Sequence, residues 1–322
     1  MPGIRDKSID FVKGVIIYLV VWGHVIQHIH HDNESSLVFN IIYSFHMPLF
    51  IFISGYFAAH TLSKSIKDVS EKVWKRLLVP ALIWSCVQFV ILLSTGYKRG
   101  LASMIVSSFR DKWFLYCLAS LYILGCVVFK AGRWKYVVAV SFAVLGYVVY
   151  KVPGVVYVEY FQPIRQWPLF VMGFAYFEYK QKCKSQMLPR NVAIVSIVMY
   201  TGLMLWLASN HPIWYIKSHE NYLTRAVIYQ AGAITWFVLF VLLYKGIAKY
   251  LSGDIVSSLG RTTMGIYVIH GKILLLMIML MPYNLLARVP SFITAIVLTI
   301  VTYWATLFLK KSPSASKYLL GE

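Results

Sequence analysis

Charge is scarce in this chain of 322 residues. Only 13% of its residues are charged, whereas about a quarter are charged in a typical soluble domain. Hydrophobic residues make up 59% of the chain, and the mean hydropathy is +0.66. Apolar runs of about 18 or more residues recur along the whole length, which is typical of repeated transmembrane helices. These features argue against a soluble domain and predict an all-α polytopic membrane protein.

Negative charge is the rarer sign. The chain has 12 Asp and Glu against 31 Lys and Arg, which gives a net charge of +19. In a soluble protein this excess would suggest a nucleic-acid partner. Here the positive residues fall mostly in alternate loops, as they do when cytoplasmic loops of a membrane protein carry the positive charge. The pattern therefore predicts both termini in the cytoplasm and no nucleic-acid partner.

Cysteine is also rare, and its spacing is uninformative. The four cysteines are Cys86, Cys117, Cys126 and Cys183. They lie in apolar runs or in a Lys-rich loop, and no pair has the spacing of a metal site or a disulfide framework. We therefore expect no bound metal.

The apolar runs predict about ten transmembrane helices in one domain that covers residues 1–322. The lipid bilayer is the expected surrounding. The approximate bounds are 11–30, 37–58, 77–95, 113–130, 135–150, 164–179, 191–209, 225–244, 262–281 and 290–309. The ninth helix can also begin near Ile255, because polar and apolar residues are mixed before residue 262.

The first predicted span, SIDFVKGVIIYLVVWGHVIQHIHH (residues 8–31), carries the cation Lys13 and the imidazole of His24. At about 100° per residue, the helix turns about 20° past three full turns between them, so both side chains lie on one face. They are about 16 Å apart along the axis. Asp10 precedes Lys13 by three residues and can pair with it. A polar face inside a membrane is a candidate functional site by default.

The two residues suit different parts of one ligand. Histidine exchanges a proton near neutral pH and suits a general base, whereas a cation at the membrane edge suits a phosphate. An acyl-coenzyme A has phosphates at one end and a thioester at the other. Two simpler interpretations stay open, namely a snorkelling Lys13 and a packing His24. His28, His30 and His31 are expected in the following loop.

The first span resembles the first-helix signature of the membrane acyltransferase 3 family, in particular its fucose 4-O-acetylase-like group. In that signature a basic residue and a histidine are separated by ten residues, as Lys13 and His24 are. Many members have arginine at the basic position, and lysine lacks its bidentate recognition of phosphate. Further segments that resemble family motifs follow in the same order: FHMPLFIFISGYF (45–57), KVWKRLLVPALIW (72–84), KWFLYCLASL (112–121) and LGRTTMGIYVIH (259–270).

The resemblance implies an integral membrane O-acetyltransferase in a bacterial plasma membrane. Such an enzyme moves an acetyl group from cytoplasmic acetyl-CoA to a hydroxyl of a lipid-linked or cell-surface sugar. O-Succinyl transfer to an exopolysaccharide is one alternative, and transport of a sugar or lipid-linked glycan without chemistry is another. A binding partner of a polysaccharide export system is a third, although the intact His24 argues against it. The acceptor sugar and the oligomeric state, a homo-oligomer included, stay open.

The chemistry of the residues, taken with the resemblance, suggests roles for them. His24 is expected to be the general base or a transient carrier of the acetyl group. The span centres contain no Asp or Glu, which disfavours a carboxylate base. The residues expected to bind acyl-CoA are Lys13, Lys72, Lys75, Arg76 and Arg261. The expected supporting residues are Asp10, His46, Ser54, Trp113 and His270. The residues expected to stack on the acceptor sugar, on the extracytoplasmic side, are Trp167, Trp214 and Tyr215.

Overall fold

A computed structural model describes residues 6–32, 36–94, 100–150, 163–183, 188–210, 222–248 and 254–322. Throughout these ranges the regular structure is helical, with no β-strand, as the apolar runs predict. Two of the residues expected to bind the acceptor, Trp214 and Tyr215, lie outside the described ranges.

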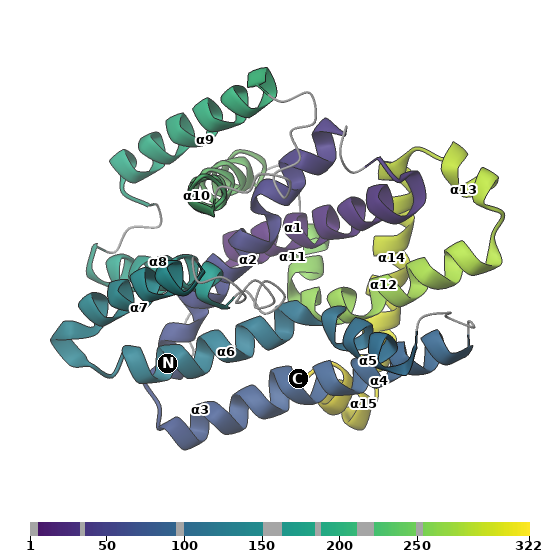
Figure 1. Ribbon diagram of the computed structural model, residues 1–322, viewed down its shortest axis with the longest axis horizontal. Coiled ribbons are helices and arrows are strands. Elements are labelled where there is room, and N and C mark those ends of the chain that lie inside the picture. The colour runs from purple at the N-terminus through teal and green to yellow at the C-terminus, as the bar shows by residue number, and fades with distance from the viewer. Residues whose placement is uncertain are drawn as a thin grey trace. The chain divides into compact units, whose positions relative to one another are not determined.

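Figure 1 shows the helices in chain order. They are α1 (Lys7–Val25), α2 (Leu37–Leu62), α3 (Ile66–Val73), α4 (Val79–Ser94), α5 (Leu101–Arg110), α6 (Trp113–Val128), α7 (Lys135–Tyr150), α8 (Pro163–Cys183), α9 (Arg190–Asn210), α10 (Tyr222–Ile247), α11 (Asp254–Arg261), α12 (Thr263–Leu280), α13 (Tyr283–Arg288), α14 (Ser291–Lys310) and α15 (Pro313–Leu319). A π-helical turn, η1 (Ile26–His30), extends α1, and a second, η2 (Trp74–Leu78), joins α3 to α4. A 3₁₀ turn, η3 (Gly132–Trp134), precedes α7.

The protein has the helices of a multi-pass membrane protein. In the described part of the chain, 7 helical stretches are long and apolar enough to cross a membrane, or 8 if α5 and α6, bent by 62° at their break, form one span. The expected count of about ten is not confirmed. Two predicted spans do not qualify as membrane-crossing helices. The first, α7, has only 16 residues, and the second, α8, has several charged residues, which include Arg165, Glu178 and Lys180. The cytoplasmic location of both termini stays a prediction.

Contacts between residues divide the chain into two compact units. Unit 1 comprises Met1–Ile53 and Glu178–Thr306, and unit 2 comprises Ser54–Phe177 and Leu307–Glu322. The divisions fall within α2, α8 and α14. The single domain expected from the sequence stays a prediction.

In unit 1, α1 packs against α10, α11 and α12. Its closest neighbour is α11, because two glycines let the backbones of these helices touch. A Cβ added to Gly14 would lie 1.9 Å from the carbonyl oxygen of Val256, and one added to Gly260 would lie 1.8 Å from that of Asp10. Small residues at a helix crossing permit this approach in membrane proteins. The crossing fixes where α11 ends relative to the first turns of α1.

In unit 2, α3 and η2 pack against α6, and α4 packs against α5 and α15. Gly55 brings the backbone of α2 against that of α8, since a Cβ there would lie 2.0 Å from the carbonyl oxygen of Phe170. The segment around η2 is therefore held by helices from three separate parts of the chain, α4, α6 and α15.

We predict that Gly260→Ala destabilises the protein, because the added methyl group forces the α1–α11 backbones apart. Overpacking of this kind costs about 1–3 kcal/mol. Gly202→Ala in α9 is the matched control: a Cβ there meets nothing within 4 Å, and alanine stabilises a helix by about 0.5–1 kcal/mol relative to glycine. Thermal unfolding in detergent measures both. Equal melting temperatures for the two variants would contradict the tight crossing.

Candidate active site

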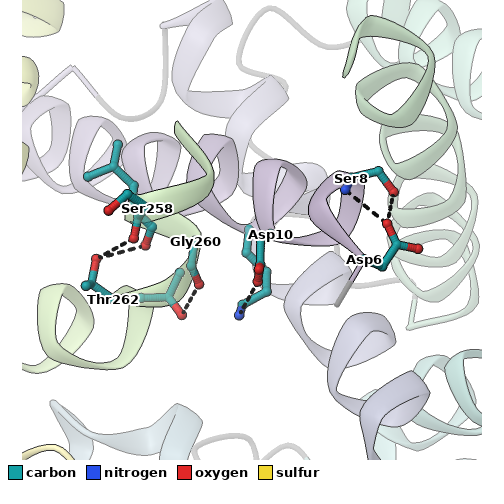
Figure 2. A network of polar contacts seen from close by, with 9 residues as sticks. Asp6, Ser8, Asp10, Ser258, Gly260 and Thr262 are labelled. Atoms are coloured by element: carbon teal, nitrogen blue, oxygen red, sulfur yellow. Dashed lines mark hydrogen bonds and ion pairs between the residues drawn. The ribbon is translucent and has the colours of Figure 1, made fainter. Parts of the chain in front are cut away.

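The polar face predicted for α1 is present in the structure. The Lys13 Nζ atom lies 3.5 Å from Asp10 Oδ1, and the two side chains are 20% and 5% exposed. Figure 2 shows this contact on α1, beside the end of α11. The expected pairing of Asp10 with Lys13 is thus confirmed. Because α1 is an uninterrupted α-helix from Lys7 to Val25, His24 keeps its predicted place on the same face, about 16 Å along the axis.

Two further histidines lie against His24. The ring centroid of His270, in α12, is 5.1 Å from that of His24. The ring of His28, in η1, stacks on His24 at 5.8 Å with only 10° between the planes. His270 is 4% exposed, His24 is half-buried and His28 is exposed. The structure therefore joins His24 to His270, two of the predicted site residues, although 246 positions separate them in the sequence.

The sequence reasoning missed His28, which it placed in a loop. The available signal was its spacing from His24, because residues four apart meet on a helix. The structure continues the helix as the π-helical turn η1, and so His28 stays beside His24.

The hydrogen bond of His270 defines which nitrogen carries its proton. Its Nδ1 lies 2.9 Å from the carbonyl oxygen of Ile266. A carbonyl oxygen only accepts, so Nδ1 donates, and in the neutral ring Nε2 bears the lone pair. His46 has the same arrangement, with Nδ1 2.7 Å from the carbonyl oxygen of Ile42. The ring of His46 lies edge-on to Tyr43, at 4.7 Å.

Side chains from α2 and α14 hold the end of α1 that carries His24. The Tyr43 hydroxyl donates to Gln27 Oε1 at 2.8 Å, and its ring lies directly over Gly23. The Trp22 indole N–H donates to Ser291 Oγ at 3.0 Å. These bonds fix the rotation of α1 and therefore the direction in which its histidine face points.

The other end of this face lies beside the break between α11 and α12. Arg261 is the last residue of α11, is exposed, and follows the glycine whose backbone touches Asp10. The Thr262 hydroxyl closes this end by donating to the carbonyl oxygens of Ser258 and Leu259, both at 3.1 Å (Figure 2). The mixed segment that left the start of the ninth span uncertain is thus a separate short helix.

The predicted cluster of Lys72, Lys75 and Arg76 belongs to unit 2 and spans the start of η2. The Lys72 ammonium donates to Thr61 Oγ1 at 2.6 Å. Lys75 forms an ion pair with Glu71, and both side chains are more than half exposed. Exposed pairs contribute only about 0–1 kcal/mol, so an anionic ligand can replace Glu71 at little cost. Arg76 is exposed.

The remaining predicted residues of unit 2 lie near helix contacts. Ser54 is half-buried beside the α2–α8 contact, and Trp113 is a half-buried first residue of α6. Trp167 is 1% exposed, and its indole N–H donates to the carbonyl oxygen of Ala139 at 2.8 Å. Its expected contact with the acceptor stays a prediction.

Lys112 is a buried cation that the sequence reasoning passed over. It is 2% exposed, and its ammonium lies 2.8 Å from Asp111 Oδ2. Both residues lie at the break between α5 and α6. Lys112 begins the segment KWFLYCLASL (112–121) that resembles a family motif, but its burial depends on the bend between the two helices.

Asp6 fixes the start of α1. Its carboxylate accepts the backbone N–H of Ser8 at 3.0 Å and forms an ion pair with Lys180, in α8, at 2.7 Å (Figure 2 shows the Ser8 contacts). Burial raises the pKa of the Asp6 carboxyl, but the hydrogen bonds from Lys180 and Ser8 and the charge of Lys180 outweigh it. The pKa of Asp6 is therefore lower than usual.

Comparisons with known proteins identify the family of this chain. A family profile described as an acyltransferase domain matches residues 6–310. The chain belongs to this acyltransferase family. The match includes every predicted site residue and confirms the resemblance drawn from the five motifs. No solved structure matches the chain.

Two relatives of this acyltransferase are nodulation proteins named NolL. The one from Sinorhizobium fredii is 34% identical over 131 residues, which cover 37% of this chain and 36% of the relative. The one from Mesorhizobium japonicum is 31% identical over 144 residues, which cover 40% of this chain and 37% of the relative. The matched stretches thus span little more than a third of either relative.

We predict that Asp6→Asn destabilises the protein at neutral pH and has little effect in acid. A lowered pKa in the folded state stabilises the fold above the unfolded value of about 3.9, and this stabilisation is lost as the pH falls below it. Melting temperatures of the wild type and Asp6→Asn in detergent should therefore converge below about pH 4. Asp6→Ala also loses the helix cap, worth about 1 kcal/mol, and should stay below the wild type at low pH. A constant gap between the wild type and Asp6→Asn would contradict the ion pair with Lys180.

Proposed function

We propose that this acyltransferase is a membrane O-acetyltransferase. It moves an acetyl group from acetyl-CoA to a hydroxyl of a lipid-linked or cell-surface sugar at a bacterial plasma membrane. The observation that carries the proposal is the polar face of α1, with Lys13 paired to Asp10 at one end and His24 against His270 at the other. The acetyl group and the sugar acceptor are proposed from the resemblance of the motifs to the fucose 4-O-acetylase-like group.

The donor binds in this proposal through its phosphates. Lys13 at the end of the α1 face is one phosphate-binding residue, and it retains partial exposure. The other basic residues proposed for the phosphates, Lys72, Lys75, Arg76 and Arg261, are also exposed or half-buried. Charge-assisted hydrogen bonds from such groups to phosphate are about twice as strong as neutral ones. The flexible arm of acetyl-CoA then carries the thioester along the α1 face toward His24.

The transfer itself needs one proton to move twice. His24 takes the proton from the acceptor hydroxyl, and the acceptor oxygen attacks the thioester carbonyl carbon. The carbon–sulfur bond then breaks, and the protonated imidazole returns the proton to the leaving thiolate. The products are the O-acetyl ester and the free thiol of CoA. If His24 instead carries the acetyl group, mixing the enzyme with labelled acetyl-CoA and no acceptor leaves the label on His24.

His270 has a supporting role in this mechanism. A general base works best when a second group orients it and stabilises its protonated form, a role that a carboxylate often fills. The span centres of this sequence contain no carboxylate. His270 lies beside His24 with Nδ1 bound to a backbone carbonyl. Its Nε2 lone pair is therefore suited to accept a hydrogen bond from His24 and stabilise the imidazolium.

We predict that His24→Ala binds acetyl-CoA normally. Its rate of acetyl transfer, measured as free CoA formed, should fall by about 10²–10⁴-fold, because the general base is lost. Lys13→Ala should weaken acetyl-CoA binding by about 10- to 150-fold, since a hydrogen bond to a charged group is worth about 1.5–3 kcal/mol. Calorimetric binding and CoA release by protein in nanodiscs measure both. His60→Ala is the control, because His60 is an exposed histidine of unit 2.

Full transfer by His24→Ala would refute the mechanism, and sugar movement without CoA dependence would indicate transport.

We also predict that His270→Phe lowers kcat by tenfold or more and leaves KM for acetyl-CoA unchanged, because only the orientation of the base is affected. His270→Gln should recover part of the lost kcat, since its amide oxygen can accept the hydrogen bond that Nε2 accepts. His60→Phe, at an exposed histidine of unit 2 with no assigned role, controls for the exchange of histidine for phenylalanine. A purely structural role for His270 predicts equal losses for Phe and Gln at this position.

A further inference from the structure

The segment 312–322 is docked on η2, the turn that carries the proposed phosphate-binding residues Lys75 and Arg76. Within unit 2, α15 packs against both α4 and η2. Ser312 caps the start of α15: its hydroxyl oxygen accepts a hydrogen bond from the backbone N–H of Ala315 at 3.4 Å. The first residue of the helix is Pro313. Both features favour a helix start at this point of the sequence.

Specific contacts hold this segment in place. The Trp84 indole N–H, in α4, donates to the carbonyl oxygen of Leu319 at 2.9 Å. The side chain of Leu320 is 1% exposed. An ion pair of 2.7 Å joins Lys310 to Glu322. The segment therefore has a hydrogen-bonded, an apolar and an ionic attachment to its surroundings.

Gly321 is the point at which this segment meets the backbone of Arg76. An added Cβ would lie 2.3 Å from the carbonyl oxygen of Arg76 and 2.8 Å from its Cα atom. Gly321 also has φ +67, a left-handed conformation that other residues adopt at a cost. The turn is closed by Glu322, whose backbone N–H donates to the carbonyl oxygen of Ser316 at 3.1 Å. Glycine in this conformation commonly ends a helix. Here the absence of a side chain at Gly321 also lets the backbone of Arg76 approach closely.

The turn that Gly321 contacts is π-helical. The backbone N–H of Val79 bonds to the carbonyl oxygen of Trp74, five residues earlier. A π-helical turn is less common than an α-helical one, and it persists where its surroundings favour it. The contact with Gly321 falls on the backbone of Arg76, in the middle of this turn, while the Arg76 side chain stays exposed.

We propose that segment 312–322 positions the donor-binding turn, and that Gly321 is a positioning residue that keeps Arg76 directed toward the phosphates of acetyl-CoA. This inference rests on the proposed function, because it takes Arg76 as a phosphate-binding residue. Gly321 then affects how tightly the donor binds without contacting the donor.

The test compares Gly321→Ala with Gly132→Ala. Both glycines have a left-handed backbone, with φ +67 and φ +59, but a Cβ at Gly132 meets nothing within 4 Å. We expect Gly321→Ala to raise KM for acetyl-CoA about tenfold and to leave kcat nearly unchanged. This pattern results when the lost interaction stabilises the bound substrate and the transition state equally. Gly132→Ala should leave KM unchanged.

A second donor separates positioning from general damage. S-Acetyl-N-acetylcysteamine is a thioester without the phosphates of CoA, so Gly321→Ala should use it as well as the wild type does. Trp84→Phe removes the bond to Leu319 and keeps an aromatic ring at this position. If Gly321→Ala fails to fold, Trp84→Phe should raise KM for acetyl-CoA in the same direction. An unchanged KM in Gly321→Ala and Trp84→Phe, or equal losses with both thioesters, would overturn the inference. A wild-type protein inactive with both thioesters would instead refute the proposed function.

Discussion

The backbone contact between α1 and α11 is the constraint on which unit 1 depends. A Cβ at Gly260 would lie 1.8 Å from the Asp10 carbonyl oxygen, so the two helices cannot separate or slide without losing their packing. This contact sets Arg261 beside the first turns of α1. It also sets the direction in which the chain turns at Thr262 into α12, which carries His270 to His24. The two ends of the polar face are thus coupled through one helix crossing.

Two segments beside or among the predicted site residues share an unusual local structure. The turn after His24 and the turn that carries Lys75 and Arg76 are both π-helical. A contact from outside each turn holds it: Tyr43 bonds to Gln27 in the first, and the backbone of Gly321 meets Arg76 in the second. π-Helical turns are rare and occur frequently at functional sites.

The chemistry proposed for this acyltransferase reflects its composition. A membrane interior penalises buried charge, and this chain places no carboxylate at its span centres. An imidazole is neutral in one of its states and so avoids most of that cost while still exchanging a proton. A pair of histidines, one bound to a backbone carbonyl and one on the polar face of α1, suits this surrounding better than the carboxylate–histidine pair of soluble enzymes.

Much of the fold and part of the site could be predicted from the sequence because they depend on local rules. Apolar runs predicted the helices, and the period of the α-helix placed Lys13, Asp10 and His24 on one face. The five motifs predicted the family. The number of spans was harder to predict, because α7 and α8 are shorter or more charged than a clear span, and α5 and α6 qualify as one span only when taken together across their 62° bend.

Tertiary structure alone decided which distant residues meet. His24 and His270, and likewise Arg76 and Gly321, are separated by more than two hundred positions, and their contacts depend on how whole helices pack. Helical periodicity carries information over a few turns only, whereas these contacts depend on crossings set by small residues such as Gly260. The sequence by itself therefore determined the helices, their polar face and the family. The packing of backbones at glycines determined which side chains share a site.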